Sequence, residues 1–145
     1  MVNILVLTGP CGVGKTACAD AVSDLLSTRD LRNAVIDMDA LRWAYPRPKE
    51  DPFNVAFGLK NLKTIWPNYA DLGIEYLILP NVVECRSELE PLLQAVPDST
   101  VTLVRLETTL ERLHQRLNRR EVGESLEWHK KRFRGATRAF YGESD

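Results

Sequence analysis

The segment that most constrains the fold of this chain lies near its N-terminus, where an apolar run passes directly into a glycine-rich loop. The run, Val2–Leu7, is built from Val, Ile and Leu without polar alternation, which is typical of a central parallel strand covered on both faces. The loop reads GPCGVGKT over residues 9–16 and fits the pattern G-x-x-x-x-G-K-[ST] without a mismatch. Apolar residues then recur at helical spacing from about Lys15 to Leu26. This order of strand, loop and helix predicts a loop that cradles a phosphate group.

Each residue type in the loop contributes to that prediction. Glycines allow backbone angles that turn successive N–H groups inward around a phosphate. Lys15 supplies a cation to the outer phosphates, and the hydroxyl of Thr16 is a ligand for Mg²⁺. We therefore expect a nucleoside triphosphate to be bound by Gly9, Gly12, Val13, Gly14, Lys15 and Thr16. The alternative is a glycine-rich turn that merely joins strand to helix, and the pattern does not name the group that accepts the phosphate.

Strands and helices alternate along the rest of the chain. We expect further strands at Ala34–Asp37, Tyr76–Leu79 and Val101–Leu106, with helices between them and an amphipathic segment over residues 125–141. Pro67 should kink or end the helix that precedes the third strand. This alternation predicts an α/β fold with a parallel sheet, formed by one domain over residues 1–145.

Two pairs of residues match the capping-box pattern at helix starts. Ser87 with Glu90 precedes the helix after the third strand, and Thr108 with Glu111 precedes the helix after the fourth. We expect each pair to mark the first turn of its helix.

Charge and cysteine content narrow the function further. The net charge of −1 argues against a protein that coats nucleic acid or an anionic membrane by bulk electrostatics. Cys11, Cys18 and Cys85 match no metal-binding spacing and are expected to be free thiols in a reducing cytosol. No stretch approaches the roughly 18 apolar residues of a membrane helix, and the apolar N-terminus is too short for a secretion signal. These features predict a cytoplasmic protein with no membrane partner.

Two aspartates follow the second strand. Period two places Asp37 and Asp39 on the same side if the strand persists, at the edge of the sheet where the glycine-rich loop lies. One carboxylate would then hold a Mg²⁺-bound water, and the other would accept a proton from a substrate hydroxyl. The alternative is that Asp39 caps a short helix at residues 40–44.

This combination resembles the small-molecule kinases of the P-loop superfamily, which include shikimate, gluconate and adenylylsulfate kinases, and chloramphenicol phosphotransferase is similar at the second strand end. The stretches DPFNVAFGLKNLKTIWPNY and PNVVECRSELEPL resemble those of uncharacterised actinobacterial P-loop kinase-like proteins. The resemblance implies a three-layer P-loop NTPase fold with ATP and Mg²⁺ as cofactors. It also implies that Asp37 supports the metal and that Asp39 binds and deprotonates the acceptor.

The helix after the fourth strand has a basic face. Its arginines are Arg112, Arg116, Arg119 and Arg120, and its leucines take the opposite face. A charged face is usually only solvated, but the resemblance implies a lid over residues 116–127 that closes on the triphosphate. In that lid Arg116 and Arg120 would act in catalysis, and Arg116 and Arg119 would contact the nucleotide.

The acceptor side of the site is expected around the second and third strand ends. Its predicted residues are Asp39, Arg42, Glu84 and Arg86, with a substrate-side insertion over residues 40–72. Glu84 and Arg86 are equally explained as an ion pair on a loop. Asn81 stands where many P-loop ATPases have an acid, and Trp43 and Tyr45 are candidates for a pocket wall.

The kinases that the chain resembles have a fifth parallel strand after the lid, which we do not find in the sequence. A reduced fold, a fragment, or a partner chain that completes the sheet, such as a homodimer, each explain this. We expect an ATP-dependent phosphotransferase that acts on a hydroxyl of a small molecule. Two alternatives stay open. One is a nucleotide-binding switch or an NTPase without an acceptor, and the other is a nucleic-acid end kinase, against which the net charge of −1 counts.

Overall fold

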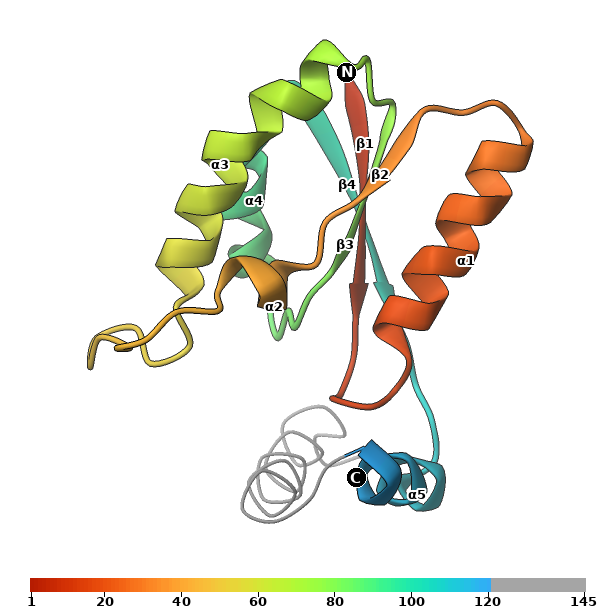
Figure 1. Ribbon diagram of the computed structural model, residues 1–145, viewed down its shortest axis with the longest axis vertical. Helices are drawn as coiled ribbons and strands as arrows, with labels where there is room; N and C mark the ends of the chain where they lie inside the picture. Colours follow the sequence, from red (N-terminus) through yellow and green to blue (C-terminus); the bar gives the residue numbers. More distant parts are fainter. Residues whose placement is uncertain (121–145) are drawn as a thin grey trace.

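The computed structural model describes residues 1–120, apart from the side chains of Leu117 and Arg120. Its centre is a parallel sheet of four strands (Figure 1), in the order β2-β3-β1-β4. The strands are β1 (Val2–Thr8), β2 (Asn33–Val35), β3 (Tyr76–Pro80) and β4 (Ser99–Arg105). Ile4 on β1 lies between Leu77 on β3 and Val101 on β4. The predicted α/β fold with a parallel sheet is confirmed, and the strands all end at one edge of the sheet.

Helices cover both faces of this sheet (Figure 1). The helix α1 (Lys15–Thr28) lies on one face, and α3 (Val55–Asp71) and α4 (Glu90–Ala95) lie on the other. The short helix α2 (Met38–Leu41) and the 3₁₀ turn η1 (Arg86–Leu89) follow β2 and β3. The helix α5 (Leu110–Arg120) lies beyond the carboxyl ends of the strands, beside the glycine-rich loop. Within residues 1–120 no helix is both long and apolar enough to cross a bilayer.

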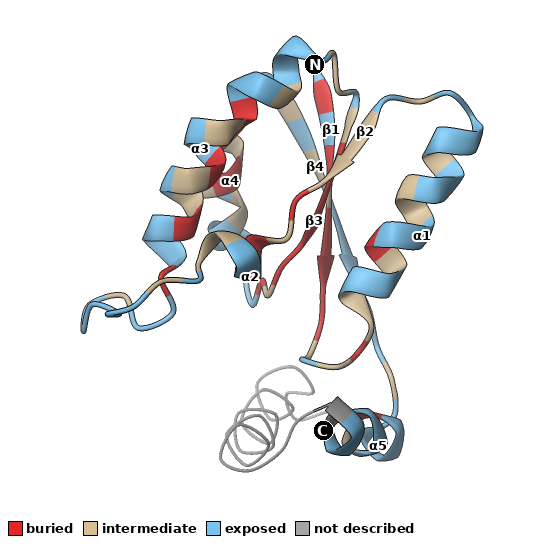
Figure 2. Cartoon of the chain, in the orientation of Figure 1, coloured by how far each residue is buried: buried red, intermediate tan, exposed pale blue. Residues whose placement is uncertain are grey.

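The core explains why β1 and β3 read as continuous apolar runs. Alternate residues of these strands enter two separate clusters, one under α3 and α4 and one under α1. Ile4 and Leu77 pack with Leu62 of α3 in the first, whereas Leu7 and Ile78 pack with α1 in the second. Figure 2 shows the buried residues concentrated on these two strands. Two central strands that are packed on both faces give the loops at their ends a rigid base.

Several predicted boundaries are wrong. The second strand ends at Val35, two residues before Asp37, and β4 covers Ser99–Arg105 rather than Val101–Leu106. Pro67 does not end its helix, since α3 continues to Asp71, and the alternative of a kink at Pro67 stays a prediction. Trp66 before the proline is buried in the core and stacks on Tyr69 after it, with ring centroids 6.5 Å apart. The helix is thus packed on both sides of Pro67, which compensates for the hydrogen bond that a proline removes.

Neither capping box forms as predicted. Ser87 lies inside the 3₁₀ turn, where its hydroxyl is 2.9 Å from the thiol of Cys85, and α4 begins at Glu90. At the start of α5 the hydroxyl of Thr109, not Thr108, accepts from the N–H of Arg112 at 3.4 Å. The spacing of a capping box occurs wherever Ser or Thr precedes Glu by three residues, so the pattern alone does not locate the first turn.

Candidate functional site

The glycine-rich loop joins β1 to α1 in the predicted order, and α1 begins at Lys15, directly after Gly14. Gly9 has φ 143° and Gly14 has φ 107°, values that residues with a β carbon rarely adopt. A β carbon at Gly9 would also lie 2.5 Å from the carbonyl oxygen of Leu106, at the exit of β4. The loop therefore needs glycine at position 9 for its backbone angle and for the close approach of a neighbouring chain segment.

Lys15 reaches back across this loop. Its Nζ donates to the carbonyl oxygens of Gly9 at 2.8 Å and Pro10 at 3.1 Å. Thr16, the next residue of α1, is exposed in the first turn. The ammonium group and the hydroxyl thus lie at the start of α1, where the helix dipole also favours an anion.

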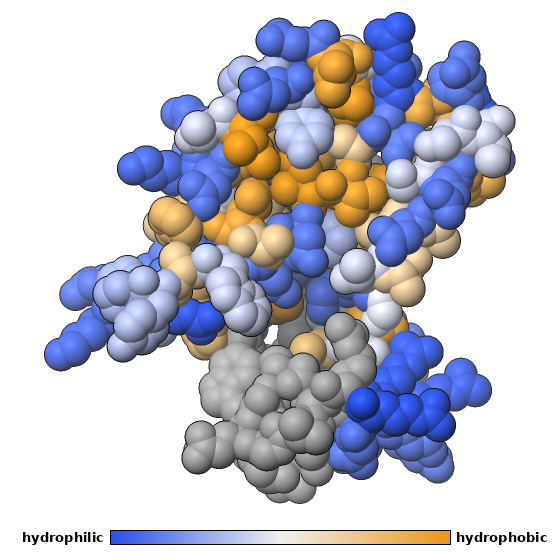
Figure 3. Space-filling view, in the orientation of Figure 1, coloured by the Kyte–Doolittle hydropathy of each residue, from blue (hydrophilic) through white to orange (hydrophobic). Residues whose placement is uncertain are grey.

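The basic helix α5 packs on the glycine-rich loop. Arg116 donates through Nη1 to the carbonyl oxygens of Val13 at 2.8 Å and Gly12 at 3.4 Å. Val13 and Leu113 are buried against each other, with Leu106 packed beside them. Figure 3 shows the surface over α5 as strongly hydrophilic. Arg116 therefore lies at the predicted nucleotide site, although sequence reasoning did not predict that it would bond to the loop itself.

The other lid residues are placed only in part. The side chain of Arg119 is exposed. The side chain of Arg120, residues 121–127 of the predicted lid and the segment over residues 125–141 lie outside the described part of the chain. Their predicted roles stay predictions.

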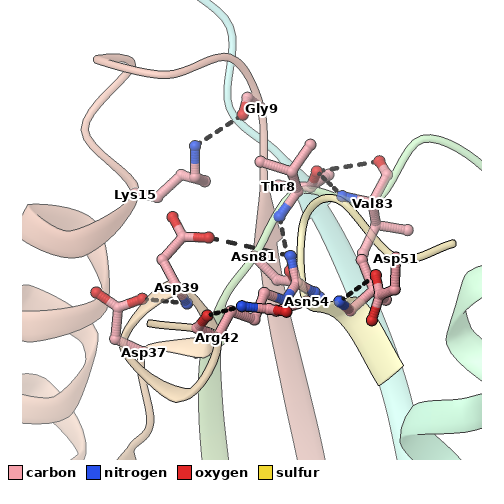
Figure 4. Close-up of polar contacts among 12 residues, drawn as sticks. Thr8, Gly9, Lys15, Asp37, Asp39, Arg42, Asp51, Asn54, Asn81 and Val83 are labelled. Atoms are coloured by element: carbon pink, nitrogen blue, oxygen red, sulfur yellow. Dashed lines mark hydrogen bonds and ion pairs between the residues drawn. The ribbon is translucent and has the colours of Figure 1, made fainter. Parts of the chain in front are cut away.

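The prediction that Asp37 and Asp39 occupy alternate positions of a strand is wrong. Asp37 is instead the N-cap of α2, and its Oδ1 accepts from the N–H of Asp39 at 2.9 Å. The alternative, in which Asp39 is the cap, is also wrong, because Asp39 lies inside the first turn. The carboxylate of Asp39 remains 68% exposed and lies 4.0 Å from Nη1 of Arg42. In Figure 4 this carboxylate points to the side on which Lys15 is drawn.

Arg42 connects this aspartate to the end of β3 (Figure 4). Its Nη2 donates to Oδ1 of Asn81 at 2.9 Å, and its side chain is only 13% exposed. Asn81 is buried, and its N–H donates to the carbonyl oxygen of Leu7 on β1. The end of β3 thus holds the guanidinium group that faces Asp39. The sequence analysis noted Asn81 only because it stands where many P-loop ATPases have an acidic residue. A polar residue directly after a buried strand is, however, itself a signal for a ligand-binding site.

Buried polar contacts also hold the segment between α2 and α3. Asn54 is buried, and its Nδ2 donates to the carbonyl oxygens of Arg42 at 2.9 Å and Ala44 at 3.2 Å. The carboxylate of Asp51 accepts from the N–H groups of Val55 and Ala56 at the start of α3. The contact from Asn54 positions Arg42 from its backbone side, and the contacts of Asp51 fix the start of α3. The sequence analysis missed Asn54 and Asp51.

The segment after β3 is tied to β1 by one hydroxyl group. Thr8 is buried, its Oγ1 donates to the carbonyl oxygen of Val83 at 3.1 Å, and it accepts from the N–H of Val83 at 2.9 Å. Glu84, which follows, is thereby placed at the carboxyl edge of the sheet. In the described part of the chain no ion pair joins Glu84 to Arg86, so that alternative is wrong.

A cavity of about 280 Å³ opens beside Arg42 and Asn81. Its lining residues are Arg42, Phe53, Val55, Leu59, Asn81, Val82, Glu84, Glu88, Pro91 and Leu92. Two predicted acceptor residues, Arg42 and Glu84, are therefore brought together in one cavity. The predicted residues Asp39, Arg86, Trp43 and Tyr45 are exposed and are not part of its lining.

The donors available for a metal are oxygens. Among the described residues no three His, Cys, Asp or Glu side chains gather into a metal cluster. The exposed hydroxyl of Thr16 and the carboxylate of Asp37 fit Mg²⁺, which prefers oxygen ligands and completes its shell with phosphate and water. One oxygen of Asp37 is already engaged as the helix cap.

Comparisons with protein-family models and with curated proteins find no match. Solved structures do resemble the chain. A sugar kinase from Janibacter sp. HTCC2649 aligns with a TM-score of 0.60 at 23% identity, over 88% of this chain and 75% of its own. The APS kinase of Mycobacterium tuberculosis, in complex with AMPPNP and APS, aligns with a TM-score of 0.55 at 19% identity, over 79% and 68%. A gluconokinase from Sinorhizobium meliloti 1021 aligns with a TM-score of 0.54 at 19% identity, over 89% and 73%. The chain therefore has the fold of the P-loop small-molecule kinases.

Proposed function

We propose that the chain is a phosphotransferase that moves the γ-phosphate of ATP to a hydroxyl of a small molecule. The observation that carries this proposal is the arrangement at the carboxyl edge of the sheet. The glycine-rich loop with Lys15 lies at the end of β1, and the cavity lined by Arg42 and Asn81 lies beyond the end of β3, beside α3 and α4. Asp39 has an exposed carboxylate on the same edge. In doubly wound sheets this edge is where ligands bind.

The loop side of the site would hold the triphosphate. The N–H groups of the loop and the start of α1 would bind the phosphates, and Lys15 would turn from the loop carbonyls toward the outer phosphate oxygens. Thr16 and Asp37 would hold Mg²⁺, which would neutralise negative charge on the phosphates. Arg116 would add a second cation close to the loop, where charge develops during transfer.

The acceptor side would supply the base. Asp39 would accept the proton of the acceptor hydroxyl, whose oxygen then forms a bond to the γ-phosphorus as the bond to ADP breaks. Arg42, held by Asn81, lies beside the carboxylate of Asp39 and would help to orient it. Phosphoryl transfer needs positioning and charge neutralisation more than covalent chemistry, and these residues would provide both.

Replacement of Asp39 by Asn tests this proposal. Asn keeps the size of the side chain but cannot take a proton at neutral pH. We expect ADP formation with an accepted hydroxyl compound to fall by about a hundred-fold or more, while ATP affinity measured by calorimetry changes only a few-fold. Asp20→Asn is the matched control, because Asp20 is an exposed aspartate on α1 away from the cavity.

Two outcomes would contradict the proposal. In one, a broad panel of hydroxyl compounds stimulates no ADP formation by the wild-type protein. In the other, Asp39→Asn turns over like Asp20→Asn. Tight ATP binding without any acceptor-dependent turnover would instead support a nucleotide-binding switch.

A further inference from the structure

Part of the hydrogen-bonding capacity of the cavity lining is taken up within the protein. Oδ1 of Asn81 accepts from both Nη2 of Arg42 and the N–H of Val82, each at 2.9 Å. The carboxylate of Glu88 accepts from the N–H of Glu84 at 3.3 Å and from the thiol of Cys85 at 3.4 Å. These groups hold the walls of the cavity in place, and each bond that they make to the protein is one fewer that they can offer to a ligand.

The remaining surface of the cavity is apolar. It is contributed by Phe53, Val55, Leu59, Val82, Pro91 and Leu92. Leu92 is buried in the main core, so this wall is continuous with the packed interior. Phe53 and Val55 keep 43% and 40% of their surface exposed, which leaves apolar surface for a ligand to cover.

The charges of the lining argue against an anionic ligand. The cavity is lined by one cationic side chain, Arg42, and by two carboxylates, Glu84 and Glu88. The guanidinium group of Arg42 is directed to Asn81 and lies beside the carboxylate of Asp39. A carboxylate or phosphate group on the acceptor would therefore meet more negative than positive charge.

We propose that the acceptor is a neutral hydroxyl compound with an apolar body about the size of one ring, rather than a sugar or a sugar acid. This inference rests on the proposed function, because it names the acceptor class for the same site. A polyol would bury several hydroxyl groups against apolar walls, and each hydroxyl without a partner lowers affinity. An apolar ring with one hydroxyl would cover Leu59 and Phe53 and place that hydroxyl beside Arg42, whose guanidinium group lies next to Asp39. A cavity of about 280 Å³ has room for such a ring and equally for a sugar ring, so the distinction rests on the lining and not on the volume.

Binding of matched probes to the full chain in the presence of Mg²⁺-ATP tests the inference. The probes are 2-phenylethanol, D-glucose and D-gluconate, and their affinities are measured from amide chemical shifts in NMR titrations. We expect 2-phenylethanol to bind at least about tenfold more tightly than either polyol, with the largest shifts at cavity residues such as Leu59 and Val82. Equal or tighter binding of glucose or gluconate would overturn the inference.

A pair of phenylalanine variants locates the binding. Phe53 lines the cavity and Phe57 does not, although their exposed fractions are 43% and 42%. We expect Phe53→Ala to weaken 2-phenylethanol binding by about fivefold or more, and Phe57→Ala to change it by less than about twofold. Both side chains lie at the surface, so both variants should fold, which their amide spectra report. The same affinity for both variants would show that the probe binds elsewhere and would overturn the inference.

Phosphate-ester formation, followed by ³¹P NMR, separates this inference from the proposed function. If 2-phenylethanol binds in the cavity and no hydroxyl compound is ever phosphorylated, the proposed function fails and the ligand class stands. If glucose or gluconate is phosphorylated efficiently and 2-phenylethanol does not bind, the function stands and the ligand class is wrong.

Discussion

The aliphatic stem of Arg42 crosses α3 directly over Gly58, so closely that a β carbon at position 58 would lie 2.6 Å from Cγ of Arg42. Gly58 is buried in the first half of α3, where a glycine costs about 1 kcal/mol of helix stability relative to alanine. The space that this glycine leaves is filled by the arginine whose guanidinium group reaches Asn81 and Asp39. Gly58 therefore positions Arg42 at the cavity.

Gly58→Ala tests this relationship. Helix propensity alone would make the variant about 1 kcal/mol more stable. We expect the methyl group to displace Arg42 instead, so that acceptor-dependent turnover falls by about tenfold while ATP affinity is unchanged. Steady-state kinetics and calorimetry measure the two quantities. In an Arg42→Ala background the same substitution should have no further effect on turnover, and a full additional loss there would contradict the positioning role.

Lys15→Ala should abolish measurable ATP binding. The substitution removes the cation that lies across the glycine-rich loop, and the outer phosphates then have no ammonium partner. Calorimetric titration with Mg²⁺-ATP measures the loss. Lys60→Ala, which removes an exposed lysine from α3, should bind ATP like the wild type. If Lys15→Ala binds as tightly as Lys60→Ala, the loop is not a phosphate site.

Arg116→Ala should lower turnover by tens-fold or more, as expected for the loss of one cation beside the transferred phosphate. Its melting temperature should change by no more than about 3 °C, because the side chain lies at the surface. Arg112→Ala is the control, since Arg112 is an exposed arginine on the same helix. A large drop in melting temperature with unchanged turnover would show that Arg116 only holds α5 to the loop.

Thr8→Val should destabilise the fold by about 1–3 kcal/mol. The variant keeps the shape of the side chain but leaves the buried N–H and carbonyl groups of Val83 without their hydroxyl partner. Urea unfolding measures the free energy of unfolding. Thr102→Val on the exposed side of β4 should change it by less than about 0.5 kcal/mol. An equal effect of the two substitutions would mean that the contact between Thr8 and Val83 contributes nothing specific.

Local features of this chain were predictable because they depend on residues that are close in sequence. The glycine-rich loop, the start of α1 at Lys15 and the buried character of β1 all follow from one stretch of about 25 residues. The positions of the parallel strands followed from apolar runs that alternate with helical patterns, and only their ends were misplaced by one or two residues. Such strands and helices can be recognised without knowing how the strands pair with their neighbours in the sheet.

The acceptor side was decided by tertiary structure. A pair of aspartates separated by one residue is compatible with a strand or with a helix cap, and the end of β2 at Val35 made Asp37 the cap. The contacts that place Arg42 come from Gly58 and Asn81, which are 16 and 39 positions away in the chain. Arg116 reaches the loop across 103 positions. By itself the sequence determined that a glycine-rich loop would form at the end of the first strand, because that geometry is local. Only the packing of α3, β3 and α5 around that edge decided which side chains face the loop and the cavity, because such contacts depend on how distant elements fit together.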